Sequence, residues 1–429
     1  MMNKFSPQLI ALLVLLSFNS YSQSLPAGNL VIVGGGLDPT NKSVYNELIE
    51  LAGGTEKASF AVIPSASGVA MQSYMSFRNI LISYRIKPEN IHLINVAMID
   101  DDSTKAVNES EWKSNGNDSS LARIVRSCSA VWFTGGDQSR TMKTLLMPDG
   151  SKTAVLEAVW DVFRSGGVVG GTSAGAAIMS EAMIGGGNSL AALTHGVIND
   201  FSGDDFPESA GVMMSPGLGF FPYGIVDQHF NQRARIGRLI VALMNEKNRF
   251  TLGFGVDENT ALIYLGKQNL VKVAGASSVT IIKTAEAGIS YIQNLPEIKN
   301  LLVSSLDNGD TFDPVTGIIT PTGDKKSTRG NEYYNVENPG QAGIFSSHSA
   351  SFHDLITVNL IDNKGADTVH NLSFFNDSSG FIVTLSKIPI SAGFYCDRQN
   401  EGDRYTVTNI RMDVSPVHIS ITPLIKKEY

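Results

Sequence analysis

A serine lies between two glycines in the segment Gly171-Thr-Ser173-Ala-Gly175. Gly-x-Ser-x-Gly is the pattern of a nucleophile elbow, a sharp turn from a strand into a helix that exposes the serine hydroxyl. The turn is strained and needs small neighbours, and the first amides of the helix favour developing negative charge. A strand-like run precedes the segment and a helix-like run follows it. We therefore predict that Ser173 is a nucleophile rather than a structural serine at a helix start.

His229 is the histidine with the most suggestive surroundings for a base. It stands in the segment Asp227-Gln228-His229-Phe230 and is followed by Arg233, Arg235 and Arg238. A lone histidine is more often structural, but three arginines and an aspartate are crowded here into an acidic protein. The alternative explanation is a solvated basic face with local ion pairs.

Two adjacent acids, Asp257 and Glu258, follow a short apolar piece and precede a strand-like segment. Adjacent residues on an extended segment point to opposite sides, so at most one of them faces a site. We predict that Glu258 orients the imidazole of His229, with Asp257 as the other option. A turn with two solvated acids is the competing explanation, because acids are common in turns.

Short apolar runs alternate with amphipathic stretches through the first half of the chain, which predicts an α/β fold with a parallel sheet. Helical spacing of apolar residues marks Met71–Tyr84 and Ala154–Phe163. Most of the strand-like runs end in glycine or serine turns, at the edge where open α/β sheets place their sites. The predicted strands are Leu30–Val33, Phe60–Ile63, Ile91–Val96, Ala130–Phe133 and Val168–Val169.

The pattern changes after about Tyr264. Alternations rich in Val, Ile and Thr, separated by glycine-rich turns, replace the helical spacing and predict strands. We expect a catalytic domain at residues 28–283 and a smaller β-rich C-terminal domain at 284–429. The sequence does not indicate a role for the second domain.

Bulk composition limits the possible functions. The chain has 42% hydrophobic and 17% charged residues, which is typical of a globular protein and not of a disordered one. Its net charge of −8 disfavours a nucleic-acid or anionic-membrane partner, since either needs excess Lys and Arg. The two cysteines, Cys128 and Cys396, are far apart, and we expect free thiols. Neither has metal-ligand spacing, so we expect no metal and no cofactor.

The first residues have the pattern of an export signal. Lys4 precedes the apolar run Leu9–Phe18, and the small residues Ser20 and Ser22 follow. This run is shorter than the ~20 residues that span a bilayer. We predict a signal peptide at residues 1–22 and a secreted protein, periplasmic or extracellular, without a membrane span. A buried N-terminal strand or helix is the alternative.

Four motifs together resemble the cyanophycinases, over about Leu30 to Gly275. They are Thr134-Gly-Gly-Asp-Gln138, Gly171-Thr-Ser-Ala-Gly-Ala176, Asp227-Gln-His-Phe230 with its three arginines, and Gly255-Val-Asp-Glu-Asn-Thr-Ala261. Cyanophycinases are serine peptidases grouped with aspartyl dipeptidase, and their fold is similar to that of class I glutamine amidotransferases. The resemblance implies a three-layer, parallel-sheet α/β catalytic domain of the flavodoxin-like type.

The resemblance also implies roles for individual residues. Ser173, His229 and Glu258 are the implied nucleophile, base and orienting acid of a triad, which is recognised by its roles and not by chain order. The amides of Gly136 and Ala174 are the implied oxyanion donors. Asp227 is expected to bind the substrate guanidinium while arginines hold its carboxylates. The implied substrate-binding residues are Gln138, Asp227, Gln228, Arg233, Arg235 and Arg238.

The implied reaction is hydrolysis of cyanophycin, multi-L-arginyl-poly-L-aspartate, to β-aspartyl-arginine dipeptides through an acyl-enzyme. Two alternatives stay open: a peptidase for small aspartyl or isoaspartyl dipeptides, and an exported binding protein on this scaffold that has lost catalysis. A glutamine amidotransferase is disfavoured, because Ser173 stands at the cysteine position of that family. We expect a peptide polymer or dipeptide as partner and no nucleic acid. The sequence leaves the oligomeric state open, with a homodimer as one option.

Overall fold

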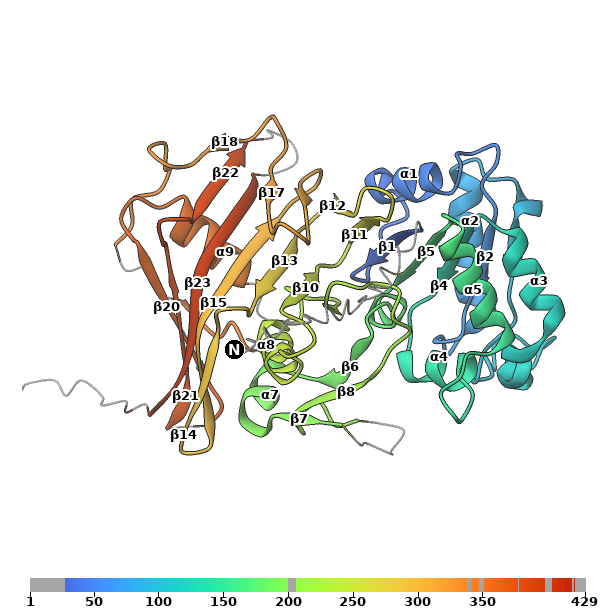
Figure 1. Cartoon of the computed structure of the whole chain (residues 1–429), viewed down its shortest axis with the longest axis horizontal. Helices are drawn as coiled ribbons and strands as arrows, with labels where there is room; N and C mark the ends of the chain where they lie inside the picture. Colours follow the sequence, from blue (N-terminus) through green and yellow to red (C-terminus); the bar gives the residue numbers. More distant parts are fainter. Residues whose placement is uncertain are drawn as a thin grey trace, which may run out of the picture.

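The computed structural model describes residues 28–199, 206–337, 339, 341–346, 351–376, 378–397, 403–418 and 420. The expected signal peptide at 1–22 lies outside these residues. Two large sheets and one small sheet form the framework. Figure 1 shows an α/β part, where helices flank the first large sheet, beside a part made mostly of strands.

The first large sheet has nine strands in the order β17-β16-β12-β11-β1-β5-β4-β2-β3. Strands β1, β5, β4, β2 and β3 are parallel, and the others add to β1 in antiparallel pairs. The parallel strands are β1 (Asn29–Val33), β2 (Phe60–Ile63), β3 (Ile91–Leu93), β4 (Ala130–Phe133) and β5 (Val168–Thr172). The antiparallel strands are β11 (Thr260–Leu265), β12 (Leu270–Gly275), β16 (Thr311–Phe312) and β17 (Ile319–Thr320). All five strands predicted in the first half are therefore present, with β3 shorter than expected.

Helices cover both faces of the parallel strands. Side chains alternate along β1, so that Val31 and Val33 pack in one buried cluster with the first two helices. Leu30 and Ile32 point the other way and pack with the third and fifth helices. These helices are α1 (Lys42–Leu51), α2 (Ala70–Ser83), α3 (Ser119–Ser127) and α5 (Ala154–Arg164). The mixed α/β character is as predicted, and α2 and α5 match the two segments with helical spacing.

The second large sheet contains eleven strands and runs through most of the C-terminal half. Its main path is β19-β20-β21-β23-β15-β13-β10-β9, with β14, β18 and β22 paired alongside. Towards the α/β part lie β9 (Ile225–Asp227), β10 (Leu252–Val256) and β13 (Val279–Lys283). The remaining strands are β14 (Gly288–Ile292), β15 (Leu295–Leu306), β18 (Lys326–Ser327), β19 (Gln341–Ala342), β20 (Thr368–Phe374), β21 (Ser379–Ser386), β22 (Ala392–Cys396) and β23 (Arg404–His418).

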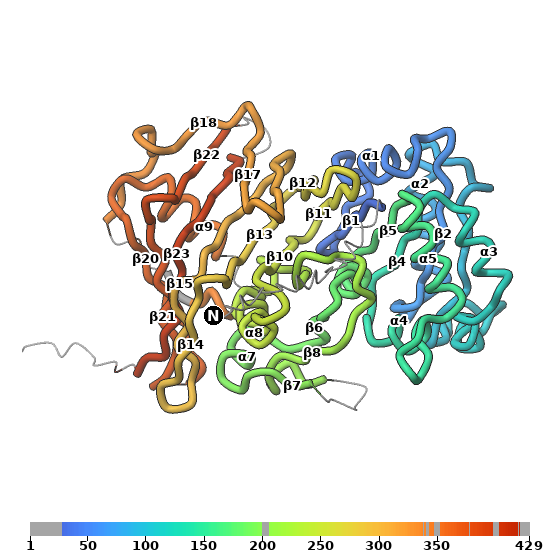
Figure 2. Tube along the Cα trace, viewed as in Figure 1, coloured from blue at the N-terminus to red at the C-terminus, as the bar shows by residue number. Residues whose placement is uncertain are grey.

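This second sheet crosses the expected domain boundary at residue 283. Strand β13, just before it, pairs along its whole length with β15, just after it, from Val279 opposite Leu306 to Lys283 opposite Leu302. Figure 2 traces the same continuity from the yellow β10 and β13 to the orange and red strands. Among the described residues after 283, strands outnumber helices, and most of these strands extend a sheet that begins in the catalytic half.

The remaining elements are small. A three-stranded sheet consists of β6 (Ala182–Gly187), β8 (Val212–Pro216) and β7 (Val197–Ile198). The other helices are α4 (Gln138–Leu145), α6 (Ala174–Ala177), α7 (Ser189–His195), α8 (Ile236–Asn245) and α9 (Ser351–Ile356), with short 3₁₀ or π turns at Pro88–Asn90, Glu109–Asn117 and Thr357–Ile361. Cys128 and Cys396 are free thiols, as expected from their separation.

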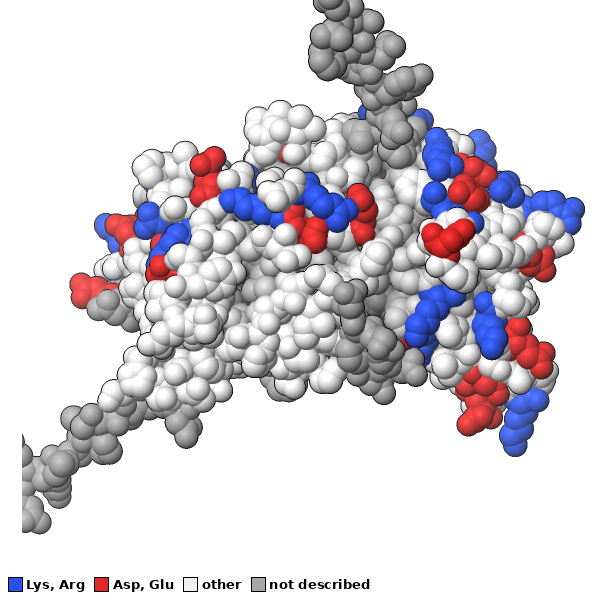
Figure 3. All heavy atoms as spheres, turned by 60° about the horizontal axis from the view of Figure 1, so that its bottom comes forward, with Lys and Arg blue, Asp and Glu red and all other residues white. Residues whose placement is uncertain are grey.

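Within the described part of the chain, no helix combines the length and apolar character needed to cross a bilayer. On the face drawn in Figure 3, lysines and arginines of the described residues are interspersed with acids and form no continuous basic surface. That face therefore lacks the concentrated positive charge that nucleic-acid binding requires.

Candidate active site

Ser173 occupies a strained turn between β5 and α6. Its φ and ψ angles are 56° and −111°, although it is not a glycine. The flanking glycines are required by packing, because a Cβ on Gly171 would lie 2.7 Å from the Gly175 carbonyl oxygen and one on Gly175 would lie 2.6 Å from that of Phe133. A positive φ at a serine after a strand is the geometry of a nucleophile elbow.

The structure brings Ser173, His229 and Glu258 into one chain of hydrogen bonds. Oγ of Ser173 lies 2.8 Å from Nε2 of His229, and Nδ1 of His229 lies 2.5 Å from Oε1 of Glu258. The histidine side chain is 10% exposed and that of Glu258 is 37% exposed. A hydroxyl, an imidazole and a carboxylate in this order are the parts that nucleophilic acyl transfer uses.

The surroundings of His229 favour its neutral form. Burial lowers the pKa of the imidazole, and the nearby positive charges of Arg233 and Arg235 act in the same direction. The hydrogen bond and negative charge of Glu258 oppose this and raise the pKa. A neutral imidazole has a free lone pair, so His229 is suited to accept the proton of Ser173.

Three loops meet around the imidazole. The backbone N–H of His229 donates to the carbonyl of Gly34 (2.7 Å), and that of Asn259 donates to the carbonyl of Gly35 (2.8 Å). Gly35 has a φ of +110°, and a Cβ there would lie 2.2 Å from Cε1 of His229. The loop after β1 therefore forms a floor beneath the histidine ring. Three consecutive glycines, Gly34–Gly36, follow this strand in the sequence and could have indicated a close approach of the backbone, but they were not predicted as site residues.

The two segments that carry the expected oxyanion donors lie beside the serine. Ala174 is the first residue of α6, where a backbone N–H has no partner within the helix. Gly136 follows β4 with a φ of +139°, and a Cβ on Gly136 would lie 2.0 Å from the Ala66 carbonyl oxygen. A Cβ on its neighbour Gly135 would lie 3.4 Å from Cβ of Ser173. Strand β4 thus ends beside the nucleophile, as its Thr-Gly-Gly segment suggested.

Two cavities flank the hydrogen-bonded chain, and their linings differ in charge. A cavity of about 470 Å³ on the side of Glu258 is charged and is lined by Gly187, Asn188, Glu208, Gln232, Arg233, Arg235 and Glu258. A cavity of about 420 Å³ on the side of Ser173 has no charged residue in its lining, which consists of Gly36, Leu37, Tyr45, Val69, Gln72, Ser73, Ser76, Phe77, Ile80, Trp132, Thr134, Gly135, Thr172 and Ser173. The serine end and the glutamate end of the hydrogen-bonded chain therefore face cavities of different charge.

Comparison with known proteins identifies the family. Peptidase family S51 matches residues 30–271. The chain belongs to this family. The cyanophycinase of Geminocystis herdmanii is 30% identical over 303 residues, which cover 68% of this chain and 97% of the relative. That of Trichormus variabilis is 31% identical over 290 residues, or 66% and 84% of the two chains. The chain is therefore a hydrolase of the serine peptidase class.

Solved structures include similar chains. A peptidase from an acI-B1 Actinobacterium has a TM-score of 0.45 and 18% identity, covering 68% of this chain and 98% of that one. A putative peptidase E protein from Listeria monocytogenes has a TM-score of 0.35 and 14% identity, covering 58% and 99%.

Asp227 and Arg238 do not reach the cavities of this S51 peptidase. Their exposed fractions are 1% and 2%, and the Arg238 guanidinium donates to both carboxylate oxygens of Asp227, at 2.8 and 2.5 Å. Arg238 also donates to the Gly187 carbonyl at 2.6 Å. The expectation that Asp227 binds a substrate guanidinium is corrected here, because its carboxylate is already occupied by an internal one.

Of the other expected binding residues, two line the charged cavity and two do not. Arg233 and Arg235 line the charged cavity. Gln138 and Gln228 are buried and line neither cavity. The side-chain amide of Gln138 donates to the Gly185 carbonyl (2.6 Å), and the backbone carbonyl of Gln228 accepts from Arg235 (2.7 Å). Glu208, which was not predicted, lines the charged cavity with the two arginines. No sequence pattern singled it out.

Among the described residues, no group of three or more His, Cys, Asp or Glu side chains is arranged to hold a metal ion. Metal independence stays a prediction that solution experiments have to test.

Proposed function

We propose that this S51 peptidase is a serine-type exopeptidase that hydrolyses cyanophycin to β-aspartyl-arginine dipeptides through an acyl-enzyme. The observation that carries the proposal is the hydrogen-bonded chain from Ser173 through His229 to Glu258, with a charged cavity beside it. Relatives named cyanophycinase, at about 30% identity, support the choice of substrate.

In this proposal Ser173 attacks the scissile carbonyl while Nε2 of His229 takes the hydroxyl proton. Glu258 accepts the Nδ1–H hydrogen bond and stabilises the imidazolium that forms. The amides of Gly136 and Ala174 donate to the oxyanion of the tetrahedral intermediate. The imidazolium then protonates the leaving amine, which departs and leaves an acyl-serine. Water, deprotonated by His229, hydrolyses this ester and restores the serine.

The charged cavity is the proposed binding site for the charged groups of the substrate. We expect Arg233 and Arg235, which line this cavity, to bind carboxylates by charge-assisted hydrogen bonds. Burial and the neighbouring Arg238 lower the pKa of Arg235, while the negative charge of Asp227 raises it. A further anion in the cavity would also favour the charged guanidinium. Glu208 is exposed in the same cavity and is our proposed partner for the substrate guanidinium, since Asp227 is not accessible.

Incubation of the purified mature protein with cyanophycin, followed by mass analysis of the products, tests the proposal. Release of β-aspartyl-arginine supports it. Cleavage of small aspartyl or isoaspartyl dipeptides without cleavage of the polymer would instead favour the related dipeptidase. Binding of either substrate without any product would favour the inactive binding protein.

The role of Glu208 has its own test. We expect Glu208→Gln to reduce kcat/KM for β-aspartyl-arginine at least about tenfold, because a hydrogen bond to a charged group is lost, and to leave β-aspartyl-leucine unaffected. Glu89→Gln is the matched control, because Glu89 is exposed and precedes β3, at the opposite end of the strands from Ser173. An equal effect on both dipeptides would remove Glu208 from arginine recognition.

We also propose that the protein acts outside the cytoplasm. The support is the sequence pattern of Lys4 followed by the apolar run Leu9–Phe18. Mass spectrometry of the N-terminus of the protein from the periplasm or the medium tests this proposal, with cleavage before Gln23 as the expected result. A protein that keeps Met1 and stays in the cytoplasm would contradict it.

A further inference from the structure

We propose that Asp257 is a positioning residue, which joins the loop that carries His229 to the loop that carries Glu258 and so holds the two in register. The inference rests on the proposed roles of His229 and Glu258, and it adds a residue that neither touches the substrate nor belongs to the triad.

The carboxylate of Asp257 is completely buried and accepts hydrogen bonds from two directions. Oδ1 accepts the backbone N–H of Asn231 at 2.9 Å. Oδ2 accepts the hydroxyls of Ser277 (2.7 Å) and Ser278 (3.0 Å) and the backbone N–H of Ser278 (3.3 Å). The donors lie in two segments far apart in the chain, so that this single side chain holds both.

The position of Asp257 in the sequence makes this link relevant to catalysis. Asn231 is two residues after His229, and Asp257 is directly before Glu258. Its carboxylate points into the protein while that of Glu258 points to the imidazole. A second link runs parallel to it, because the backbone N–H of Glu258 donates to Oε1 of Gln232 at 3.0 Å. The two loops are thus joined by two hydrogen bonds in addition to the His229–Glu258 contact.

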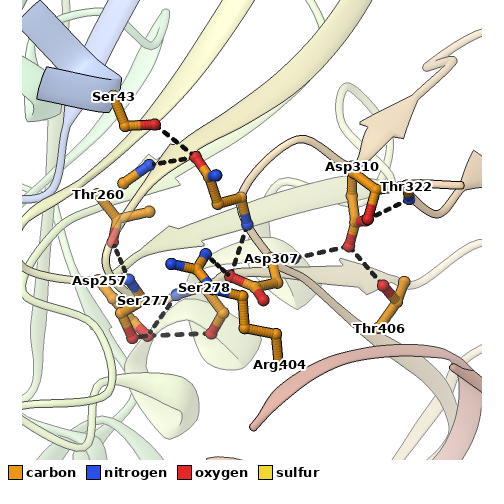
Figure 4. Close-up of polar contacts among 12 residues, drawn as sticks. Ser43, Asp257, Thr260, Ser277, Ser278, Asp307, Asp310, Thr322, Arg404 and Thr406 are labelled. Carbon is orange, nitrogen blue, oxygen red and sulfur yellow. Dashed lines mark hydrogen bonds and ion pairs between the residues drawn. The ribbon is translucent and has the colours of Figure 1, made fainter. Parts of the chain in front are cut away.

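The serine turn that holds Asp257 is itself fixed. The backbone N–H of Ser277 donates to Oγ1 of Thr260 at 2.8 Å, and that of Gly275 donates to Oδ1 of Asn308 at 3.0 Å. Figure 4 shows Ser277, Ser278 and Thr260 beside Asp257, with Asp307 and Arg404 further along the same polar region. Asp257 therefore connects the histidine loop to a turn that is itself hydrogen-bonded to Thr260 and Asn308.

This support includes residues beyond the family match at 30–271. Oδ1 of Asp307 accepts from the Asn308 backbone N–H (2.6 Å) and from Arg404 of β23 (3.1 Å). Lys325, whose side chain is 1% exposed, forms an ion pair with Asp310 (2.9 Å). The polar cluster of Asp307, Asp310, Lys325 and Arg404 fastens the last strand next to the serine turn. A role for part of the C-terminal segment follows: it braces the loop of the orienting acid.

Opposing effects act on the pKa of Asp257. Burial raises the pKa of this carboxyl, whereas the hydrogen bonds from Ser277, Asn231 and Ser278, together with the charge of nearby His353, lower it. An asparagine at this position keeps the size but offers only one oxygen, and its amide N–H₂ would face a group that also donates. Asp257→Asn therefore loosens the link with little change in volume.

The test uses the full-length mature protein and the variant Asp257→Asn. We expect kcat for β-aspartyl-arginine to fall about 10- to 100-fold with KM changed less than about threefold, because a small misplacement of reacting groups slows the reaction without weakening binding. We also expect the far-downfield proton resonance of the His229 Nδ1–H hydrogen bond to weaken or disappear from the NMR spectrum of the free enzyme. This resonance is measured without substrate, so it tests the inference even if the proposed substrate is wrong.

Asp362→Asn is the matched control. Asp362 is also completely buried and accepts from a hydroxyl, that of Tyr405 (2.8 Å), and from a backbone N–H, that of Tyr333 (2.9 Å), in the C-terminal segment. We expect this variant to lose thermal stability but to keep kcat and the downfield resonance. Parallel loss of kcat in both variants, or an unchanged kcat or resonance in Asp257→Asn, would overturn the inference.

If Asp257→Asn does not fold, Ser277→Ala and Ser278→Ala replace it. Each removes one hydroxyl that donates to Oδ2 and leaves the charge in place. We expect each to lower kcat severalfold and to weaken the same resonance. Wild-type values of kcat and of the resonance in both serine variants would refute the positioning role.

Discussion

Oε1 of Glu258 lies 2.5 Å from Nδ1 of His229, while Nε2 of the same ring lies 2.8 Å from Oγ of Ser173. A carboxylate can only accept, so it holds the tautomer with the proton on Nδ1 and leaves the Nε2 lone pair facing the serine. That tautomer is the one able to take the hydroxyl proton. The geometry thus prepares proton transfer before substrate arrives.

Ser173→Ala is expected to abolish hydrolysis while leaving the thermal stability close to that of the wild type. Loss of a triad serine typically lowers kcat on the order of 10⁶-fold, with oxyanion and binding effects remaining. Alanine at a φ of 56° has about the same backbone strain as serine, so the substitution should leave the conformation of the turn unchanged. Turnover of cyanophycin by the variant at the wild-type rate would show that another group is the nucleophile.

The activity should persist at a lower pH than the ordinary pKa of histidine suggests. The base must be neutral, and protonation inactivates it as the pH falls through its pKa. Because burial lowers the pKa of His229 from 6.5, kcat/KM should fall to half its plateau at a pH below 6.5. A profile of kcat/KM between about pH 4 and 8 measures this. A midpoint above 6.5 would mean that the attraction of Glu258 outweighs burial.

Gly35→Ala is expected to lower kcat about 100-fold by displacing the imidazole. The new Cβ would lie 2.2 Å from Cε1 of His229, on a residue whose φ is +110°. Gly54→Ala is the control for backbone strain alone. Gly54 also has a positive φ, +79°, but nothing lies within 4 Å of the added Cβ. Both variants should lose stability by about 1–2 kcal/mol, and only the first should lose activity. Equal kcat values for Gly35→Ala and Gly54→Ala would contradict the contact between Gly35 and the imidazole.

The contrast between Ser173 and Asp227 indicates how far the sequence could lead. The serine elbow was predictable because the strand, the two glycines and the helix that form it are adjacent in the chain, so its conformation depends on local sequence. The partner of Asp227 was not, since Arg238 reaches it only when α8 folds back beside β9. Asp227 and Arg238 have chemistry that suits a charged substrate, but only the folded structure shows that Arg233 and Arg235 line the charged cavity and that Asp227 and Arg238 do not.

The order of the strands was predictable only in part. The alternation of strands and helices indicated the parallel sheet, because parallel strands need crossover connections that usually contain a helix. The pairing of β15 with β23 was not predictable, since these strands are far apart in sequence. Nor was the pairing of β13 with β15, because an alternating pattern does not show which strands are neighbours. For this reason residue 283 looked like a domain boundary although the sheet continues through it.

Dialysis against a strong chelator should leave the rate unchanged. The proposed chemistry is acyl transfer by a serine, which needs no Lewis acid. The measurement is kcat/KM for β-aspartyl-arginine before and after dialysis, with the thermal midpoint followed in parallel. Loss of activity that a single added metal restores would overturn this expectation.

Asp227→Asn distinguishes an internal ion pair from a substrate contact. With Asp227 at 1% exposure and paired to Arg238, the substitution leaves a buried guanidinium without its counter-charge. Breaking such a pair by removing one partner costs about 3–5 kcal/mol of stability. We therefore expect a lower midpoint of thermal unfolding and a similar reduction of kcat/KM for β-aspartyl-arginine and β-aspartyl-leucine.

Replacing both Asp227 and Arg238 by apolar residues also tests whether they form an internal ion pair. Substitution of a buried ion pair by apolar residues of similar volume is often neutral or stabilising, so Asp227→Leu with Arg238→Met should recover stability relative to Asp227→Asn alone. Residual activity should recover with it, because neither side chain lines the charged cavity. A loss confined to arginine-bearing substrates, at unchanged stability, would instead mean that the pair opens and Asp227 meets the substrate guanidinium.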